Sequence, residues 1–259
     1  MILIFTPCHG RRDLASKTFA SIEVHVPRPW THLVVDDFSP PMDSRWFGRQ
    51  TGPVADGAKR AMVHAKNLGL KLTEPPNLGA TLGFAWEQAL KLDAEALLCV
   101  ESDVLLRPGI VEAFREAQTL HRGLAGAVAP LYVKVRGYEI TSFGGFPGSR
   151  MSLPIGAKIG GWKQSVPLID SLPWAHLACL WVPRATLERD IHPDPEFRLY
   201  FQDHDLCNQI RRAGLEIIVT DRAVAEHDKA GPSTGLLWGS EGSKVEAEAH
   251  NQLLRKWKP

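Results

Sequence analysis

Short apolar runs alternate with amphipathic stretches along the first 130 residues. Ile2–Phe5, Leu33–Val35 and Ala96–Val100 are continuous apolar runs, each followed by polar or turn-forming residues. Such runs are typical of parallel strands that are buried on both faces. Between them, residues 78–89 and 110–117 carry apolar side chains at helical spacing. The alternation predicts an α/β fold with a mostly parallel central sheet flanked by helices.

Residues 131–172 have a different pattern, because they are rich in glycine and proline. We expect a long loop region here, in which a hairpin is the regular element that could form. Loops of this length in a compact domain usually carry function.

Regular elements are expected again after this Gly-rich segment. Leu177–Val182 predicts a strand, and a short helix should follow from Pro183. Asp203–Arg212 predicts a helix, with Asp203 as its N-terminal cap. The remaining expected elements are two strands, Leu215–Val219 and Ala223–Ala225, and a polar tail helix over residues 243–258. No linker or repeat divides the chain, so we expect a single domain over residues 1–259.

Composition and charge narrow the class of protein. The chain is 44% hydrophobic and 23% charged, which is ordinary for a globular protein. Its 30 basic and 29 acidic residues give a net charge of +1, so it is not expected to bind nucleic acid through bulk charge. The cysteines lie far apart and form no C-x-x-C pair, which favours free thiols in a reducing compartment. They are Cys8, Cys99, Cys179 and Cys207.

Neither a membrane span nor a signal peptide is expected from the sequence. No apolar run approaches the roughly 18 residues of a spanning helix, and the apolar start before Pro7 is too short for a signal peptide. We therefore expect a cytoplasmic protein. The tail, with Arg255, Trp257 and Lys258, is expected to be a solvated terminal helix. Contact with a membrane surface or with a second subunit is the alternative for the tail.

Polar clusters follow the expected strands, where α/β sheets bind their ligands. The segment Thr6–Arg12 leaves the first strand with small residues and two arginines that could meet phosphates. Asp36-Asp37 follows the second strand and could accept hydrogen bonds from a ribose or a base, although paired acids are also common in turns. If the chain stays extended after Val100, then Glu101 and Asp103 point to the same side and suit a divalent cation.

A further cluster lies at the start of the helix over Asp203–Arg212. Gln202, Asp203, His204 and Asp205 follow an aromatic run there. The helix dipole would keep such carboxylates ionised, and an ionised carboxylate that reaches a substrate hydroxyl can act as general base. Simple helix capping is the alternative interpretation. His227, after the last expected strand, is a structural histidine or a metal ligand.

Taken in chain order, these clusters resemble the family 2 glycosyltransferases, which have the GT-A fold, and most closely the rhamnosyltransferase-like branch. The resemblance covers about residues 1–235, and each of its motifs is weak when taken alone. They are Thr6-Pro7-Cys8, Val34-Val35-Asp36-Asp37, Asn77-Leu78-Gly79-Ala80, Glu101-Ser102-Asp103-Val104 in place of D-x-D, Phe201-Gln202-Asp203-His204-Asp205-Leu206 resembling E-D-x-D-L, and His227 before Gly231 and Ser233.

The resemblance implies a nucleotide-binding half over residues 1–130 and an acceptor-binding and catalytic half over 131–235. The polar tail helix, within residues 236–259, follows the part that the resemblance covers. It implies that Asp203 is the general base and that Asp103 and His227 are metal ligands. Gln202 is neutral where the family has an acid, so it can hydrogen-bond a sugar hydroxyl but cannot titrate. The implied nucleotide-sugar contacts are Thr6, Cys8, Asp36, Asp37, Asn77, Gly79, Glu101 and Ser102.

The resemblance further implies a metal-dependent and inverting reaction. The donor would be a nucleoside diphosphate sugar, the cofactor Mn²⁺ or Mg²⁺, and the acceptor a carbohydrate or a lipid-linked hydroxyl. The Gly-rich region with Trp162 would lie over the site, on the acceptor side, together with Trp174, His176 and Gln202. Aromatic rings pack well against the apolar face of a sugar, although both tryptophans could equally belong to the core.

Two other function classes are compatible with the same pattern. A noncatalytic nucleotide- or glycan-binding protein on this fold would account for the departures at Glu101 and Gln202, but it would not need Asp103, Asp203 and His227 together. A nucleotidyltransferase that makes sugar nucleotides should carry a Gly-rich basic loop after the first strand. Here that loop is only His9-Gly10-Arg11-Arg12, which argues against this class.

Overall fold

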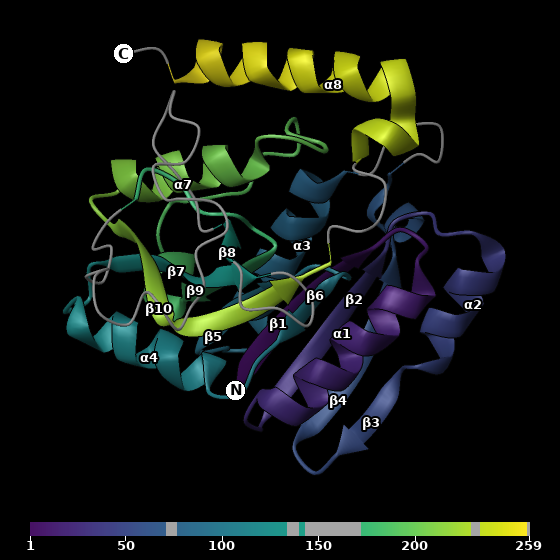
Figure 1. Ribbon diagram of the computed structural model, residues 1–259, viewed down its shortest axis with the longest axis horizontal. Coiled ribbons are helices and arrows are strands. Elements are labelled where there is room, and N and C mark those ends of the chain that lie inside the picture. The colour runs from purple at the N-terminus through teal and green to yellow at the C-terminus, as the bar shows by residue number, and fades with distance from the viewer. Residues whose placement is uncertain (71–76, 134–139, 143–171, 229–233, 258–259) are drawn as a thin grey trace.

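The alternating pattern builds one continuous sheet with helices on both faces (Figure 1). The structure is a computed structural model that describes residues 1–70, 77–133, 140–142, 172–228 and 234–257. The predicted α/β fold with a central sheet flanked by helices is confirmed.

The sheet contains strands from both halves of the chain. Its strands are β1 (Ile2–Cys8), β2 (Trp30–Asp36), β3 (Gly52–Ala55), β4 (Ala58–His64), β5 (Ala96–Val100), β6 (Val104–Leu106), β7 (Ala125–Val133), β8 (Ile140–Ser142), β9 (Cys179–Pro183) and β10 (Glu216–His227). The helices are α1 (Arg12–His25), α2 (Pro41–Arg49), α3 (Leu78–Lys91), α4 (Ile110–Leu120), α6 (Arg184–Leu187), α7 (Gln202–Arg212) and α8 (Thr234–Lys256), with a 3-10 turn η1 (Ala65–Leu68).

The strand order is β3-β4-β2-β1-β5-β9-β7-β10-β6, and β8 pairs with β7. The neighbours β4, β2, β1 and β5 are parallel, and β7 is parallel to β10. The strand β9 is antiparallel to both β5 and β7. Consequently β7 and β10 run in the same direction as the strands of the first half, and all of these strands end at the same edge of the sheet.

Alternate side chains of each central strand enter different halves of the core, which explains the continuous apolar runs. In β1, Leu3 and Phe5 pack with α3 and α7, whereas Ile2 and Ile4 pack with α1 and α4. Figure 1 shows α1 and α4 in front of the sheet and α3 behind it. All four cysteines are buried free thiols, as expected.

Two predicted strands are in fact one. Leu215–Val219 and Ala223–Ala225 both belong to β10, whose pairing with β7 shifts register between Thr220 and Val224. The polar residues in between are exposed on a bulge, and Arg222 pairs with Glu116 of α4. A polar interruption therefore produced an irregularity of the strand and not a turn.

Several other boundaries differ from the prediction. The strand β9 begins at Cys179, and β2 is followed by α2 and the β3–β4 hairpin, which the sequence analysis did not predict. The expected hairpin in the Gly-rich segment is formed by β7 and β8. The rest of that segment, including Trp162, lies outside the described residues. The tail helix begins at Thr234, earlier than predicted.

The end of the tail is packed against the protein and is not simply solvated. The Trp257 indole donates a hydrogen bond of 2.8 Å to Asp205 of α7, and the Lys256 ammonium lies 2.9 Å from the same carboxylate. The Asp205 side chain is only 1% exposed, so it needs these partners. The prediction of a solvated terminal helix was therefore wrong for these last residues.

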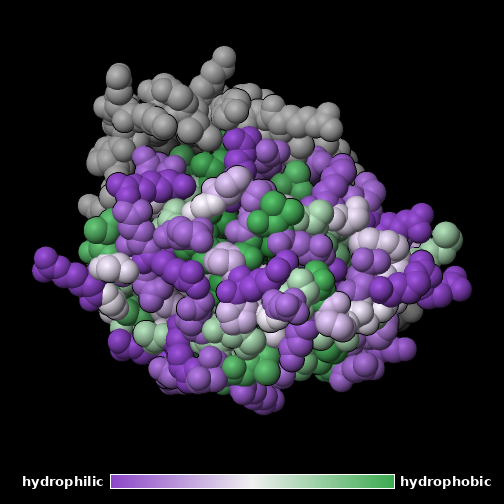
Figure 2. Space-filling model, turned by 90° about the horizontal axis from the view of Figure 1, so that it is seen from below, coloured by the Kyte–Doolittle hydropathy of each residue, from purple (hydrophilic) through white to green (hydrophobic). Residues whose placement is uncertain are grey.

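The face seen in Figure 2 is mostly hydrophilic, with apolar side chains in small separate groups. Single apolar residues on a surface are ordinary. Among the described residues, no helix is long and apolar enough to cross a membrane.

Candidate active site

The polar clusters of the sequence meet at the edge where the parallel strands end. Asp36 and His64 end β2 and β4, Glu101 follows β5, and His227 ends β10. Ligands of open α/β sheets bind beyond the carboxyl ends of the strands. The arrangement therefore places the candidate chemistry where this class of fold usually holds its ligands.

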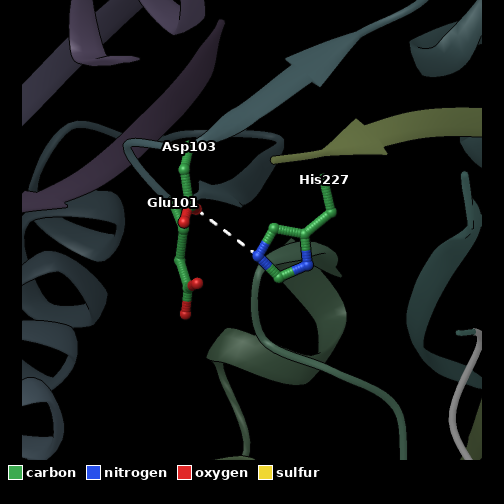
Figure 3. A group of neighbouring side chains, drawn as sticks. All are labelled: Glu101, Asp103 and His227. Atoms are coloured by element: carbon green, nitrogen blue, oxygen red, sulfur yellow. Dashed lines mark ion pairs between the residues drawn. The ribbon is translucent and has the colours of Figure 1, made fainter. Parts of the chain in front are cut away.

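Glu101, Asp103 and His227 form one cluster (Figure 3). One possible ligand atom of each residue lies within 4.8 Å of the others. Within the cluster, His227 Nε2 lies 3.5 Å from Asp103 Oδ1. The Asp228 amide also donates to the Asp103 carbonyl at 2.9 Å, so the end of β10 is tied to this segment.

The expected reason for this convergence was wrong. Glu101 and Asp103 do not share one side of an extended strand, because the chain turns after β5 and Val104 N donates to Glu101 O at 3.1 Å. Ser102 lies within this turn. The carboxylates meet through the turn, and β10 brings the histidine to them from a distant part of the chain.

The donor set fits a divalent cation. Carboxylate oxygens suit Mg²⁺, and Mn²⁺ accepts both carboxylate and imidazole ligands. In the structure a positive group already lies beside the cluster, since Arg11 Nη1 is 3.6 Å from Asp103 Oδ2. Arg11 has a left-handed backbone with a φ of 56°, immediately before α1. The carboxylates of the cluster are therefore already paired with one positively charged group.

Asp203 lies in the first turn of α7, among histidines. Its Oδ1 accepts hydrogen bonds of 2.9 Å from both the amide and the Nδ1 of His204, and its Oδ2 is 3.8 Å from His176 Nδ1. Burial alone would raise the pKa of Asp203, but the hydrogen bond and charge of His204 and the charge of His176 lower it below its usual value. Asp203 is therefore held as a carboxylate.

Asp203 is not the cap of α7, which corrects the prediction. The cap position is taken by Phe201, which has a φ of 63° and provides no side-chain hydrogen bond. Asp203 lies two residues further on and bonds to its own neighbour. Its carboxylate is thus occupied in a side-chain cluster and does not close the helix end.

Trp174 and His176, which the sequence analysis assigned to the acceptor side together with Gln202, lie in the cluster around Asp203 and His204. The Trp174 ring stacks on His204 with centroids 4.3 Å apart and meets His176 edge-on at 4.7 Å. One face of Trp174 is therefore covered by the protein. Gln202 Oε1 is buried without a hydrogen-bond partner in the described part of the chain, so it can still accept a hydrogen bond from a ligand.

Tyr132 connects the two clusters, and the sequence analysis missed it. Its ring centroid lies 5.8 Å from the rings of both His176 and His227. The side chain is fully buried, and its hydroxyl accepts from the Cys179 amide at 2.7 Å. Tyr132 lies within an apolar run, so nothing in the sequence indicated a role in the site. The pairing of β7 with β9 and β10 reveals its position. The acidic cluster and the cluster around Asp203 therefore both adjoin the Tyr132 ring.

Asp36 and Asp37 are both buried at the end of β2. Asp36 accepts from the Ser39 amide at 3.1 Å and lies 3.1 Å from His64 Nδ1. Asp37 accepts from the Asn77 amide at 2.9 Å. Burial raises the pKa of Asp37, and the Asn77 amide opposes this rise. Asp36 lines a cavity of about 820 Å³, which is in the size range of small-ligand sites.

The side chains of Thr6 and Cys8 do not line an open pocket, in contrast to their expected role. Thr6 is fully buried, with its hydroxyl 2.9 Å from His32 Nε2. Cys8 packs in a cluster with Phe19 and Phe47, and burial raises the pKa of its thiol. Only the backbone of these two residues remains to face a ligand.

Asn77 and Gly79 have structural tasks at the start of α3. The Asn77 side chain caps the helix by accepting from Ala80 N at 2.8 Å. A Cβ on Gly79 would lie 2.3 Å from the Asp194 carbonyl oxygen and 2.6 Å from that of Phe197. Gly79 is therefore required because the loop that contains Asp194 and Phe197 packs closely against α3. This holds whether or not Gly79 also contacts a nucleotide.

Comparison with known proteins gave matches only at the level of structure. No family model matches the sequence, and no curated protein matches it. The solved structure of GalNAc-T7 with UDP, GalNAc and Mn²⁺ matches with a TM-score of 0.68 at 12% identity. TarS from S. aureus matches with a TM-score of 0.58 at 12% identity and, in complex with UDP-GlcNAc, with 0.61 at 14%.

The chain has a GT-A-like fold. The matches cover 98% to 99% of this chain, so the GT-A-like fold extends over nearly all of it. This chain in turn spans 65% and 66% of the two TarS chains and 48% of GalNAc-T7. At this identity the matches establish the fold, and the chemistry has to be argued from the site.

Proposed function

We propose that this protein is a metal-dependent glycosyltransferase that moves a sugar from a nucleoside diphosphate sugar to an acceptor hydroxyl. One observation carries the proposal: the cluster of Glu101, Asp103 and His227 and the cluster of Asp203 with its histidines both adjoin Tyr132, whose ring centroid lies 5.8 Å from those of His227 and His176. The fold supports it, because the matching GalNAc-T7 structure contains UDP and Mn²⁺ and one TarS structure contains UDP-GlcNAc. The sequence motifs favour family 2 and its rhamnosyltransferase-like branch.

The donor would lie along the ends of β1, β2 and β5. Asp36 and Asp37 would face the nucleoside, beside the cavity at the ends of β2 and β4. Asp103 and His227 would hold the cation, and the structure adds Glu101 to this set. A bound divalent cation would offset the charge that develops on the diphosphate leaving group. The other expected donor contacts are the backbone of Thr6 and Cys8, and Asn77, Gly79 and Ser102.

Asp203 would act as the general base. It would take the proton of the acceptor hydroxyl while the acceptor oxygen forms a bond to the anomeric carbon of the donor sugar. The bond from that carbon to the phosphate oxygen breaks in the same step, and its electron pair leaves with the diphosphate. A single displacement of this kind inverts the anomeric centre.

The acceptor would bind around Trp174, His176 and Gln202. The buried Gln202 Oε1 would accept a hydrogen bond from an acceptor hydroxyl, which would give this oxygen the hydrogen-bond partner that it lacks among the described residues. Such a site suits a carbohydrate or a lipid-linked acceptor.

Thermal unfolding with UDP, dTDP, GDP and CMP, each with Mn²⁺ and again with EDTA, tests the donor site. We expect one nucleoside diphosphate to raise the melting temperature only when Mn²⁺ is present, because a ligand that binds the folded state stabilises it. Asp103→Ala should abolish this shift. Asp190→Ala is the matched control, because Asp190 is fully exposed and pairs with the exposed His192.

A stabilisation that is equal with Mn²⁺ and with EDTA would contradict the metal-dependent site. Loss of the shift in Asp190→Ala as well would show that the measurement reports general stability. The nucleotide that raises the melting temperature would also identify the nucleobase of the donor.

A further inference from the structure

The two oxygen atoms of Asp203 have different surroundings. Oδ1 accepts two hydrogen bonds of 2.9 Å, from the amide and from the Nδ1 of His204. Oδ2 lies 3.8 Å from His176 Nδ1, which is beyond hydrogen-bond distance. Oδ1 is thus occupied by the protein, whereas Oδ2 can receive a hydroxyl.

The His204 ring is held in place from two sides. Trp174 stacks on it at 4.3 Å and itself packs against the core. Phe201 meets the ring at 5.2 Å, tilted by 59°. Phe201 in turn stacks on His250 of α8 at 5.4 Å. An imidazole fixed in this way presents its Nδ1 to Asp203 in one orientation.

We propose that His204 is a positioning residue for the base: its Nδ1 holds Asp203 Oδ1, so that Oδ2 is left ionised and directed to the acceptor. This inference deepens the proposed function and rests on it. The acceptor proton goes to Oδ2, and the electron pair of the broken O–H bond forms the new bond to the anomeric carbon. His204 keeps its own proton throughout.

Other titratable groups surround this pair and must be considered in any pH profile. His176 faces Asp203 from the segment before β9. On α7, Cys207 interacts with Asp203, while Asp205 is tied to Lys256 and Trp257 of the tail. Tyr132 lies against His176, and His250 lies behind Phe201. Only His204 is within hydrogen-bond distance of the Asp203 carboxylate among the described residues.

The test compares His204→Phe, which keeps an aromatic ring against Trp174 but lacks the donor, with His204→Gln, which keeps a side-chain N–H donor. His192→Phe is the control, because the His192 side chain is 72% exposed and pairs with Asp190. The first readout is the titration of the Asp203 carboxyl carbon by NMR without any donor sugar, assigned with Asp203→Asn. The second is the pH profile of kcat/KM for transfer.

In wild type we expect Asp203 to titrate below the usual midpoint of an aspartate. In His204→Phe the midpoint should rise by about one pH unit or more. Burial raises the pKa of Asp203, and the variant lacks the hydrogen bond and charge of His204 that counteract this rise. The acidic limb of kcat/KM should rise by the same amount, and kcat should fall about tenfold. His204→Gln should recover most of both, with nucleotide affinity unchanged in every variant.

A wild-type midpoint at or above the usual value would overturn the proposal, and so would an unchanged midpoint in His204→Phe. The wild-type titration decides the matter even if His204→Phe does not fold. If the midpoint moves as expected but no acceptor is glycosylated, then the proposed function fails while the pairing of His204 with Asp203 stands.

Discussion

At the scale of single residues, Asp103 of the acidic cluster is contacted from three sides. Its Oδ1 faces His227, its Oδ2 faces Arg11, and its carbonyl accepts from Asp228. The side chain is 18% exposed. A carboxylate with so little access to water needs nearby positive charge. Arg11 and a divalent cation would therefore compete for the same oxygen atoms.

Arg11→Gln is expected to tighten the binding of Mn²⁺ alone by about threefold to fivefold, since partly exposed ion pairs contribute up to about 1 kcal/mol. Isothermal titration calorimetry without nucleotide measures this directly. Arg12→Gln is the matched control, because Arg12 pairs with Asp43 away from the cluster. Weaker Mn²⁺ binding in Arg11→Gln would mean that Arg11 supports the cation site and does not compete with it.

Asp203→Asn should leave nucleotide binding intact and lower kcat for transfer by about 10² or more, because an amide cannot take the acceptor proton. The measurement pairs nucleotide affinity from calorimetry with initial rates of transfer. An active Asp203→Asn variant would refute the assignment of the base.

Asp103, His227 and Asp203 could be singled out from the sequence as candidate site residues. Each is a polar residue that follows an apolar strand or begins a helix near one, where α/β folds bind ligands. Tyr132 could not be found in this way, since a tyrosine inside an apolar run resembles any core residue. The burial of the Thr6 and Cys8 side chains was missed for a related reason. Position after a strand does not say which way a side chain points, and both are buried in the core.

At the scale of secondary-structure elements, the start of α3 is joined to the loop before α7. The Leu78 amide donates to the Arg198 carbonyl, and the Asn77 side chain donates to the Pro195 carbonyl at 3.2 Å. Lys256 of α8 pairs with Asp194 of the same loop at 2.7 Å. Hydrogen bonds and an ion pair therefore join the tail, the loop before α7 and helix α3. The cap of α3, Asn77, is in turn bonded to Asp37.

Gly79→Ala should destabilise the protein by about 1 to 3 kcal/mol, because its Cβ would overlap backbone oxygens that cannot turn away. Gly83→Ala is the matched control on the same helix, where the nearest atom would be 3.7 Å away. Its better helix propensity should make it neutral or stabilising. Urea unfolding of both variants measures the difference, and equal stabilities would contradict the close packing at Gly79.

The apolar runs predicted β1, β2, β5 and β9, but they did not predict β7, the direction of β9 or the unity of β10. Strand direction depends on contacts between distant segments, which hydrophobic periodicity does not contain. The exposed pair Asp221 and Arg222 looks like a turn in the sequence, whereas pairing with β7 accommodates it as a bulge. The cap of α7 was assigned to Asp203 by residue type, and the backbone instead turns at Phe201.

At the scale of the whole molecule, one buried network limits stability at acidic pH. His32 is fully buried, its Nδ1 accepts from Arg60 Nε at 2.9 Å, and its Nε2 is bonded to Thr6. Arg60 also pairs with Glu23 at 2.8 Å. Burial first, and then the charge of Arg60, lower the pKa of His32 well below its usual value. His32 is therefore neutral in the folded protein.

Because the unfolded chain can protonate His32 below about pH 6.5 and the folded chain cannot, stability should fall as pH drops through this value. The expected loss from this residue is about 1.4 kcal/mol at pH 5.5. Urea unfolding at pH 7.5 and 5.5 should show a smaller pH effect, by this amount, in His32→Gln than in wild type. An identical pH dependence in both proteins would place a proton on His32 in the folded state.

The antiparallel insertion of β9 has a practical consequence for experiments on this protein. Since β1, β2, β4, β5, β7 and β10 all end at one edge, the candidate residues that end or follow these strands lie there and away from the opposite edge. The exposed turn at Asp56 and Gly57, between β3 and β4, lies at that opposite edge. A fluorophore or a surface linkage attached at Asp56 would leave the reactive edge open, so binding and transfer could be followed on immobilised protein.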